Sequence, residues 1–367
     1  MKLTKLSIFS TKPYDKKYLQ AALDAREADA AATTARYPIE LTFHDFPLNA
    51  TTVALLPEGQ DAVCVFVNDA LPAPVVHALA DRGVSAILLR CAGFNHVDLE
   101  AARARGLMVA NVPSYSPEAV AEFAVALLQT LNRGTHRAYN RVREGNFALE
   151  GLLGRTLHGK TVGVVGTGRI GLAAARILAG FGCRVLAYDL FPNEAALGEI
   201  GRRGAAAEYR DLDSLLAESD ILTLHCPLTP QTKHMINDDT IARLQKKDVL
   251  LVNTSRGGLV DTDAVVRGLK SRRLGGVALD VYEGEGSLFY EDHSGDIIED
   301  DVLMRLMTFP NVIVTGHQAF FTDEALHEIA ECTLRNLDEF VRTGTAANSL
   351  THEDRKTERK PHPVRNV

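Results

Sequence analysis

Three side chains that can bind a carboxylate or move a proton follow short runs of Val, Leu and Ile. They are Arg256, one of the two carboxylates Glu283 and Glu285, and His317. If these runs are parallel strands, their carboxyl ends meet at one edge of a sheet and bring the three groups together. Arginine can grip a carboxylate with two parallel N–H groups and polarise a neighbouring ketone. An imidazole can donate a proton to the ketone oxygen, and a carboxylate behind it favours its charged form. This set suits hydride transfer to a 2-oxo acid.

A glycine-rich turn supplies a place for the hydride donor. Gly166, Gly168 and Gly171 form G-x-G-x-x-G directly after the apolar run 161–165 and before a helical pattern. In such a turn the backbone approaches a pyrophosphate, which also meets the positive end of the helix. Asp189 ends the next apolar run, where a carboxylate accepts hydrogen bonds from a ribose diol and repels a 2′-phosphate. The pattern therefore favours NAD over NADP, although Asp189 could instead cap a loop.

Apolar runs alternate with Ala-rich helical segments along most of the chain, which is typical of parallel sheets covered on both faces. A first series of predicted strands comprises residues 6–9, 62–67, 85–90 and 108–111, and a second comprises 161–165, 184–189, 221–225, 249–253, 277–281 and 312–315. Two series predict two α/β domains. Pro113 and Pro117 mark the join, before a helical pattern that reaches about residue 146. A last helix over 323–343 could return to the first domain.

Composition narrows the class of protein. The 367 residues carry a net charge of −7, and the segment 283–301 holds eight acidic side chains without a Lys or Arg. The sequence shows no basic patch of the kind that binds nucleic acid, and no apolar stretch in it is long enough to span a membrane. The N-terminus lacks a signal-peptide pattern, and the five cysteines form no C-x-x-C pair. We therefore predict that the thiols are reduced, that the protein is cytoplasmic and that it has no metal site.

Taken together, these motifs resemble the D-isomer-specific 2-hydroxyacid dehydrogenases. The resemblance rests on Gly166-x-Gly-x-x-Gly171, Asp189, His225-Cys-Pro, Asn253-Thr-Ser-Arg256-Gly, Asp280-Val-Tyr-Glu-x-Glu285 and Thr315-Gly-His317. It is strongest toward the fermentative bacterial branch that reduces pyruvate to D-lactate with NADH, through residues 10–18, 90–95, 131–133, 225–230 and 315–320. It covers nearly everything from residue 1 to about 345.

The resemblance implies a role for each matching position. Arg256, Glu285 and His317 would be the catalytic residues, which selects Glu285 over Glu283. The NAD contacts would be Gly166, Gly168, Arg169, Ile170, Gly171, Asp189, Cys226, Pro227, Thr232, Thr254 and Asp280. The backbone N–H groups around Ala92 and Gly93, with Tyr115, would hold the substrate carboxylate. Phe66 and Phe320 would wall the substrate side chain, which suits the methyl group of pyruvate.

The family also implies an architecture of two doubly wound parallel-sheet domains. A flavodoxin-like substrate domain would comprise residues 1–112 and 318–345, a Rossmann NAD-binding domain 113–317, and a disordered tail 346–367. Relatives form homo-oligomers, and the helical segment 117–146 is a plausible interface. Two alternatives remain: the same chemistry on hydroxypyruvate, glyoxylate, phenylpyruvate or a branched-chain 2-oxo acid, and an NAD-sensing binding protein like the C-terminal-binding corepressors.

Overall fold

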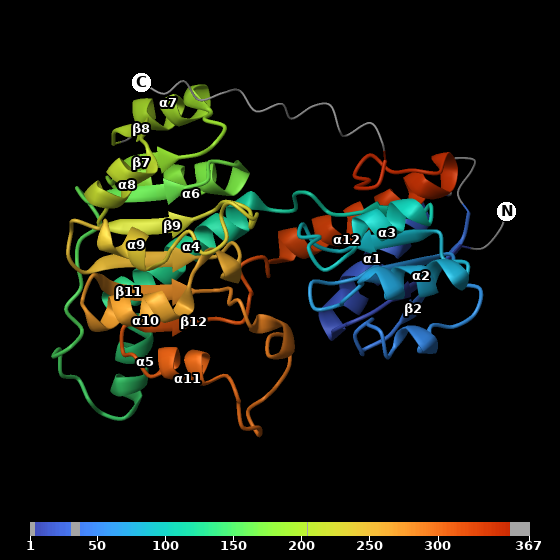
Figure 1. The fold of residues 1–367 in the computed structure, drawn as a ribbon, viewed down its shortest axis with the longest axis horizontal. Coiled ribbons are helices and arrows are strands. Elements are labelled where there is room, and N and C mark those ends of the chain that lie inside the picture. The colour runs from blue at the N-terminus through green and yellow to red at the C-terminus, as the bar shows by residue number, and fades with distance from the viewer. Residues whose placement is uncertain (1–3, 31–36, 204, 353–367) are drawn as a thin grey trace. The chain divides into compact units, whose positions relative to one another are not determined.

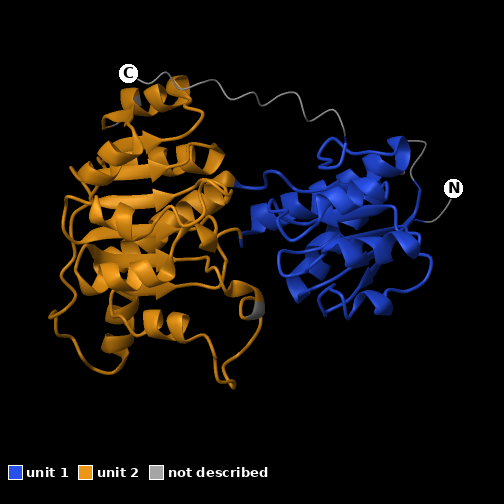
Figure 2. Ribbon diagram, viewed as in Figure 1, with its two compact units in different colours: residues 1–116, 321–360 blue, residues 117–320, 361–367 orange. Residues whose placement is uncertain are grey.

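The chain divides into two compact units, each with its own parallel sheet. The computed structural model describes residues 4–30, 37–203 and 205–352. Unit 1 is built from the described residues up to 116 and from the returning segment 321–352, and unit 2 is built from the described residues of 117–320 (Figure 2). These divisions fall three or four residues beyond the expected joins at 112/113 and 317/318.

Unit 1 is built on a five-stranded parallel sheet in the order β2-β1-β3-β4-β5. This is the flavodoxin-like strand order, as expected. Its elements in the structure are β1 (Thr4–Ile8), α1 (Pro13–Ala30), β2 (Ile39–Phe43), β3 (Ala62–Val65), α2 (Ala73–Asp81), β4 (Ala86–Leu89), α3 (Leu99–Ala104), β5 (Met108–Ala110) and α12 (Asp323–Thr343).

One face of this sheet is covered by the first and last helices of the chain. Leu19 and Leu23 of α1 pack with Leu334 and Leu337 of α12 against side chains of the central strands, and all are buried. α1 and α12 lie side by side in the ribbon (Figure 1). The predicted helix 323–343 therefore returns to unit 1, because its apolar stripe completes a core that α1 alone leaves open.

The segment after α12 corrects the prediction of a disordered tail from residue 346. Ser349 forms an antiparallel bridge with Ala110, and the Leu350 N–H donates to the Val109 carbonyl at 2.6 Å. The Thr351 hydroxyl lies 3.1 Å from the Leu107 carbonyl. The segment is polar, but β5 is an edge strand whose free backbone groups can pair with any extended chain. The rest of that prediction, residues 353–367, lies outside the described residues.

Unit 2 is built on a seven-stranded parallel sheet in the order β12-β11-β10-β9-β6-β7-β8. The strand order reverses between β6 and β9, as in the Rossmann fold. Its elements are α4 (Pro117–Arg133), α5 (Thr135–Arg143), β6 (Thr161–Val165), α6 (Arg169–Gly180), β7 (Arg184–Tyr188), α7 (Glu194–Arg203), β8 (Ala207–Tyr209), α8 (Leu212–Glu218), β9 (Ile221–Leu224), α9 (Asp238–Ala242), β10 (Val249–Asn253), α10 (Thr262–Lys270), β11 (Leu274–Leu279), α11 (Asp301–Met307) and β12 (Val312–Val314).

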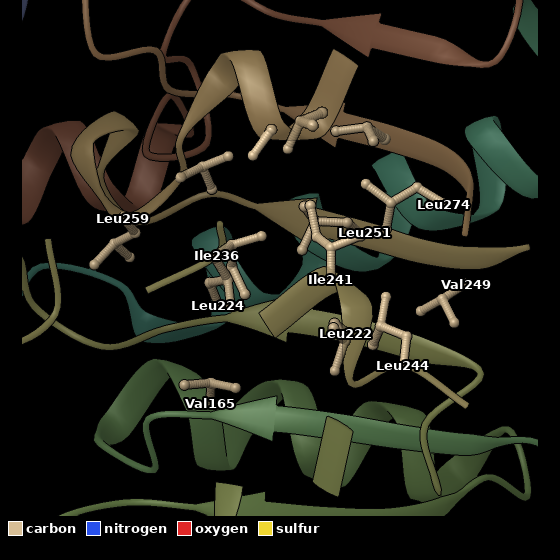
Figure 3. Close-up of a cluster of buried hydrophobic side chains, with 14 of the residues drawn as sticks. Val165, Leu222, Leu224, Ile236, Ile241, Leu244, Val249, Leu251, Leu259 and Leu274 are labelled. Carbon is tan, nitrogen blue, oxygen red and sulfur yellow. The ribbon is translucent and has the colours of Figure 1, made fainter. Parts of the chain in front are cut away.

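Both faces of this second sheet are buried. In β10, Val249 and Leu251 face α8, α9, α10 and α11, whereas Leu250 and Val252 face α4, α6 and α7. Figure 3 shows the first of these two layers, where Leu251, Ile241 and Leu274 pack together. Strands with apolar side chains on both faces read as continuous Val and Leu runs, which is why the sequence located them so well.

The differences from the predicted elements have local causes. The expected helix to residue 146 is interrupted at Gly134, which has a φ of +57° and separates α4 from α5. Two strands are missing from the predicted series, β2 and β8, and both lie at sheet edges. Glu40 and Thr42 in β2 and Glu208 in β8 interrupt the apolar run that identified the other strands, including the edge strands β5 and β12.

The cysteines agree with the sequence interpretation: Cys64, Cys91, Cys183, Cys226 and Cys332 are all buried free thiols. In the described part of the chain, no helix combines the length and the apolar character that crossing a membrane requires.

Candidate active site

The glycine turn joins β6 to α6 at the point where the strand order of unit 2 reverses. Gly166 has a φ of +93°, and a Cβ there would lie 2.6 Å from the backbone nitrogen of Cys226. A Cβ on Gly171 would lie 1.9 Å from the Gly166 carbonyl oxygen. Only glycine fits these two positions, because strand, turn and helix approach each other backbone to backbone.

The same turn has room for a phosphate group. A Cβ on the exposed Gly168 would meet no atom within 4 Å, so the turn faces open space there. α6 begins at Arg169 without a side-chain cap, while Arg169 is exposed and Ile170 is half-buried. The first N–H groups of this helix therefore remain available to an anion, as a pyrophosphate-binding turn requires.

Asp189 lies beside this turn, directly after β7. One carboxylate oxygen accepts hydrogen bonds from the Thr167 N–H at 2.5 Å and the Thr167 hydroxyl at 3.0 Å. The other accepts from the Phe191 N–H at 2.9 Å. Asp189 thus caps its own loop and is also fixed against the glycine turn. A carboxylate oxygen accepts more than one hydrogen bond, so the loop contacts and a ribose contact are compatible.

The other predicted cofactor residues gather after β9 and β10. Cys226 is buried, and its carbonyl accepts a 2.7 Å hydrogen bond from Ser255, which ties the ends of the two strands together. Burial raises the pKa of the Cys226 thiol to about 11, so it stays protonated near neutral pH. Thr232 is held by a 2.7 Å hydrogen bond to the carbonyl of the exposed Pro227.

Thr254 carries the clearest sign of an absent partner at this edge. Its hydroxyl oxygen is buried and has no hydrogen-bond partner among the described residues. Buried hydroxyls are normally satisfied, so this hydroxyl is free to hydrogen-bond a nucleotide bound at the same edge. Together with the open turn at Gly168, it indicates that these residues fit a dinucleotide.

His317 and Glu285 form a hydrogen-bonded pair at the carboxyl edge of unit 2. The His317 Nδ1 lies 2.9 Å from a Glu285 carboxylate oxygen, and the two side chains are 17% and 22% exposed. The second Glu285 oxygen accepts the Tyr282 N–H at 2.8 Å. Glu283 instead lies 2.7 Å from His234, on a different partner. The geometry therefore separates the two carboxylates that spacing left undecided.

Asp280 anchors the loop that carries His317. Its fully buried carboxylate accepts hydrogen bonds from the Thr315 hydroxyl at 2.5 Å and from the N–H groups of Gln318 at 2.9 Å and Ala319 at 2.8 Å. His317 lies between these anchored residues with a φ of +55°, an uncommon backbone conformation for histidine. Burial raises the pKa of Asp280, and the three hydrogen bonds oppose that rise. Asp280 thus anchors the His317 loop, and the cofactor contact that the resemblance implies for it stays a prediction.

Arg256 is half-buried in the turn after β10. Its carbonyl accepts the Asn253 side-chain N–H at 2.9 Å, and one guanidinium nitrogen donates to the Ser255 carbonyl at 2.6 Å. The other guanidinium nitrogens make no hydrogen bond within the described residues, so they remain able to grip a carboxylate. A Cβ on the following Gly257 would lie 2.0 Å from the carbonyl carbon of Tyr282, so only glycine allows this turn to pass the β11 end.

Comparison with known proteins identifies the family. The profile of the D-isomer specific 2-hydroxyacid dehydrogenase, NAD binding domain, matches residues 125–319. A 2-hydroxyacid dehydrogenase A of Aspergillus oryzae is 63% identical over 349 residues, which cover 95% of this chain and 96% of that protein. The chain belongs to the D-isomer-specific 2-hydroxyacid dehydrogenases.

Further relatives and solved structures extend over nearly the whole dehydrogenase. A D-lactate dehydrogenase of Curvularia clavata is 60% identical, over 94% of this chain and 95% of that one. The apo-structure of D-lactate dehydrogenase from Escherichia coli superposes with a TM-score of 0.81 at 47% identity, over 95% and 100% of the two chains. The Aquifex aeolicus D-lactate dehydrogenase complexed with NAD and lactic acid gives 0.79 at 32% identity, over 95% and 99%. The cofactor of this dehydrogenase family is NAD, as predicted.

The predicted substrate residues of the dehydrogenase fall in both units. Phe66, Ala92, Gly93 and Tyr115 belong to unit 1, and the buried Phe320 ends the main segment of unit 2. The Ala92 carbonyl accepts a 2.8 Å hydrogen bond from the Asn111 side chain. Because a trans peptide points its C=O and N–H in opposite directions, this bond turns the Gly93 N–H away from Asn111.

One contact of His317 was missed at the sequence level. The Tyr290 hydroxyl donates to the His317 carbonyl at 3.2 Å, and the two ring centroids lie 5.9 Å apart. Tyr290 lies in the acidic segment 283–301, which carries no apolar periodicity. Neither its type nor its spacing distinguishes it, because the contact arises from how the loop folds back toward β12.

Proposed function

We propose that this dehydrogenase reduces pyruvate to D-lactate with NADH. The observation that carries the proposal is the His317–Glu285 pair, with its 2.9 Å hydrogen bond at Nδ1. The His317 Nε2 has no hydrogen-bond partner within the described residues and so remains for a substrate. The 60% identity to the Curvularia clavata D-lactate dehydrogenase supports the choice of substrate.

In the proposed mechanism, NADH supplies a hydride to the carbonyl carbon. His317 donates its Nε2 proton to the carbonyl oxygen, so that the C=O bond becomes the C–OH of lactate. Glu285 stabilises the charged imidazole before this transfer and holds its ring through Nδ1. The loop anchored by Asp280 keeps the imidazole in place. In the reverse reaction His317 accepts the hydroxyl proton.

Arg256 would bind the substrate carboxylate and draw electron density from the adjacent ketone. The N–H groups at Ala92 and Gly93, with Tyr115, would hold the same carboxylate from unit 1. Phe66 and Phe320 would face the methyl group. In this proposal unit 1, with its returning helix, serves as the substrate domain, and unit 2 serves as the NAD-binding domain.

The proposal is tested by following NADH oxidation with pyruvate and then assigning the chirality of the lactate formed. Rates with hydroxypyruvate, glyoxylate, phenylpyruvate and a branched 2-oxo acid give the comparison. We expect the highest kcat/KM with pyruvate and a D product. Faster turnover of phenylpyruvate would replace the substrate while keeping the reaction. Tight NADH binding without turnover of any 2-oxo acid would favour an NAD-sensing binding protein.

We also propose that the enzyme assembles as a homo-oligomer through α5 and the loop that follows it. Phe147, Leu149 and Leu153 are each at least 74% exposed. α4 is less suitable than the sequence indicated, because its apolar residues already pack inside unit 2. Changing the three loop residues to serine should lower the mass measured by light scattering to that of one chain. An unchanged mass would place the interface elsewhere.

We propose a cytoplasmic location and a fermentative direction, in which pyruvate reduction regenerates NAD⁺. The five free buried cysteines support a reducing compartment. Cell fractionation with an antibody tests the location. Lactate secretion under oxygen limitation, with and without the gene, tests the direction.

A further inference from the structure

A cluster of buried charges lies at the carboxyl edge of the unit 1 sheet, where no reacting group is proposed. Arg90 follows β4, Asp69 follows β3, and Asp15 lies in the first turn of α1. The Arg90 side chain is 2% exposed and that of Asp15 is 9% exposed. Charges removed from water to this degree need a specific set of partners. The partners of this cluster converge on Phe66.

Arg90 is held from one side of its guanidinium. Its Nε lies 3.0 Å from an Asp15 carboxylate oxygen, and its Nη2 donates to the Ser10 carbonyl at 2.8 Å. The Nη1 is buried and makes no hydrogen bond to any residue that the structure describes. The guanidinium carbon lies 4.8 Å from the centroid of the Phe66 ring. The cation therefore covers the Phe66 ring and is itself fixed by an ion pair.

The backbone of Phe66 is fixed by the second charge. One Asp69 oxygen accepts the Phe66 N–H at 2.6 Å, and the other accepts the Leu48 N–H at 2.6 Å and the Ser10 hydroxyl at 2.8 Å. Ser10, whose φ is +51°, thus contacts both Asp69 and Arg90. The carboxyl ends of β1, β3 and β4 are joined through these side chains around a single phenylalanine.

The opposite edge of the same sheet carries a similar pair, which serves as an internal comparison. Arg26 of α1 lies 2.6 Å from Asp338 of α12, and its guanidinium carbon lies 5.1 Å from the Tyr37 ring. The Tyr37 hydroxyl donates to Asp338 at 2.7 Å, just before β2 begins. The chemistry matches that of Arg90, Asp15 and Phe66, but the edge is the amino edge, away from the proposed substrate residues.

We propose that Arg90 is a positioning and specificity-determining residue, which fixes the Phe66 ring so that it admits a methyl group and rejects longer side chains. This rests on the proposed function, in which Phe66 walls the substrate side chain. A buried ion pair adds little stability over apolar residues of similar volume, so the proposal rests on where the Arg90 pair lies, against the Phe66 ring, and not on the presence of an ion pair. An apolar side chain at position 90 would fill the space, but it would make no cation–π contact with the Phe66 ring. It would also lack the ion pair with Asp15 that orients the guanidinium.

The test compares two double variants of the full-length enzyme. R90M/D15N removes both charges at the carboxyl edge, and R26M/D338N removes the matching pair at the amino edge. For each we would measure kcat and KM for pyruvate and for 4-methyl-2-oxopentanoate, the Kd for NADH, and the melting temperature. In R90M/D15N we expect the preference for pyruvate to fall about 10-fold or more, mainly through KM, with the NADH Kd within about twofold of the parent. R26M/D338N should melt earlier and keep its preference within about twofold.

Equal changes of preference in both variants, or none in either, would overturn the proposal. If R90M/D15N does not fold, the substrate preference of R90K is measured instead. Lysine keeps the positive charge beside Asp15 but lacks the flat guanidinium that covers the Phe66 ring. A parental preference in R90K would then count against the ring contact. The parent is assayed first on both acids. A parent that prefers the longer acid overturns both the proposed substrate and the proposed rejection of longer side chains. A parent that prefers pyruvate supports the proposed function, and the two double variants then test the role of Arg90 alone. Absence of turnover on any 2-oxo acid would overturn both.

Discussion

The carboxyl edges of the two sheets use charged side chains in opposite ways. At the unit 2 edge, His317 and Glu285 are each about one-fifth exposed, and the His317 Nε2 has no hydrogen-bond partner among the described residues. At the unit 1 edge, Arg90 and Asp15 are almost completely enclosed, and Asp69 is 1% exposed with three hydrogen bonds. A group that exchanges a proton with a ligand must keep one face open. An enclosed charge can only hold its neighbours.

The difference has an energetic side. A charge enclosed by protein depends on every partner, because an uncompensated buried charge is strongly destabilising. A half-open pair loses less when one member is removed, since water can replace the missing partner. Substitutions at the unit 2 edge should therefore change rates more than stability, and those at the unit 1 edge should change stability as well.

The largest effect is expected for His317→Gln. Removing the proton donor should lower kcat for pyruvate by about 10²–10⁴-fold, because a placed acid–base group contributes that much. The NADH Kd and the melting temperature should stay close to those of the parent. His293→Ala, which removes a second histidine paired with a carboxylate, 3.0 Å from Asp296, is the matched control. Stopped-flow measurement of NADH oxidation gives the rate. A variant with parental turnover would exclude His317 as the acid.

Asp69→Asn should be the most damaging single change to the stability of unit 1. The asparagine side chain keeps one acceptor oxygen, but its NH2 group replaces the other oxygen of the carboxylate. That NH2 group would face N–H or O–H donors, with which it cannot form the hydrogen bonds that Asp69 now accepts. The free energy of unfolding should fall by about 2–4 kcal/mol, because several buried hydrogen bonds to a charged group are lost. Urea unfolding followed by circular dichroism measures it. Asp81→Asn, on an exposed aspartate in the same unit, is the control. If the two variants are equally stable, the enclosed edge is less dependent on its charges than we propose.

Glu285→Gln should have a smaller effect on rate. Glutamine can still accept the His317 N–H, but it no longer stabilises the imidazolium, so kcat should fall by about 10–100-fold, as for the loss of a charged hydrogen-bond partner. Glu283→Gln, whose partner is His234, should leave kcat within about twofold. Steady-state kinetics with pyruvate distinguishes the two. Equal losses in both variants would contradict the separation of these carboxylates.

The smallest expected effect concerns His225 at the unit 2 edge, a half-buried residue whose Nδ1 is buried. Burial lowers its pKa to about 4, and its Nε2 lies 2.9 Å from the Thr223 hydroxyl. Between about pH 6.5 and 4 the unfolded chain binds a proton that the folded chain does not, so stability falls as the pH falls. His225→Asn should reduce this loss by about 1–2 kcal/mol. Urea midpoints at pH 7 and pH 5 measure it, with the exposed His327→Asn as control. An unchanged pH dependence would mean that His225 is charged in the fold.

Much of the fold could be predicted from particular residues. The central strands of unit 2, such as Val249–Asn253, are apolar on both faces and appear in the sequence as they do in the structure. The glycine turn and the acid after β7 indicated the cofactor. The edge strands β2 and β8 and the pairing of residues 349–351 with β5 could not be found this way, because they depend on backbone groups left free at a sheet edge.

The candidate site likewise has residues that the sequence predicted and contacts that only the tertiary structure shows. Residue types and strand ends alone selected Arg256, His317 and a carboxylate, because parallel strands bring their carboxyl ends together whatever the loops do. Only the tertiary structure shows that Glu285 pairs with His317 whereas Glu283 pairs with His234. It also shows that Asp280 anchors the His317 loop and that Arg90 is enclosed against Phe66. These are contacts between loops and strands far apart in the chain. Strand periodicity records which way a side chain faces, but a loop's direction is set by the partners it meets after folding.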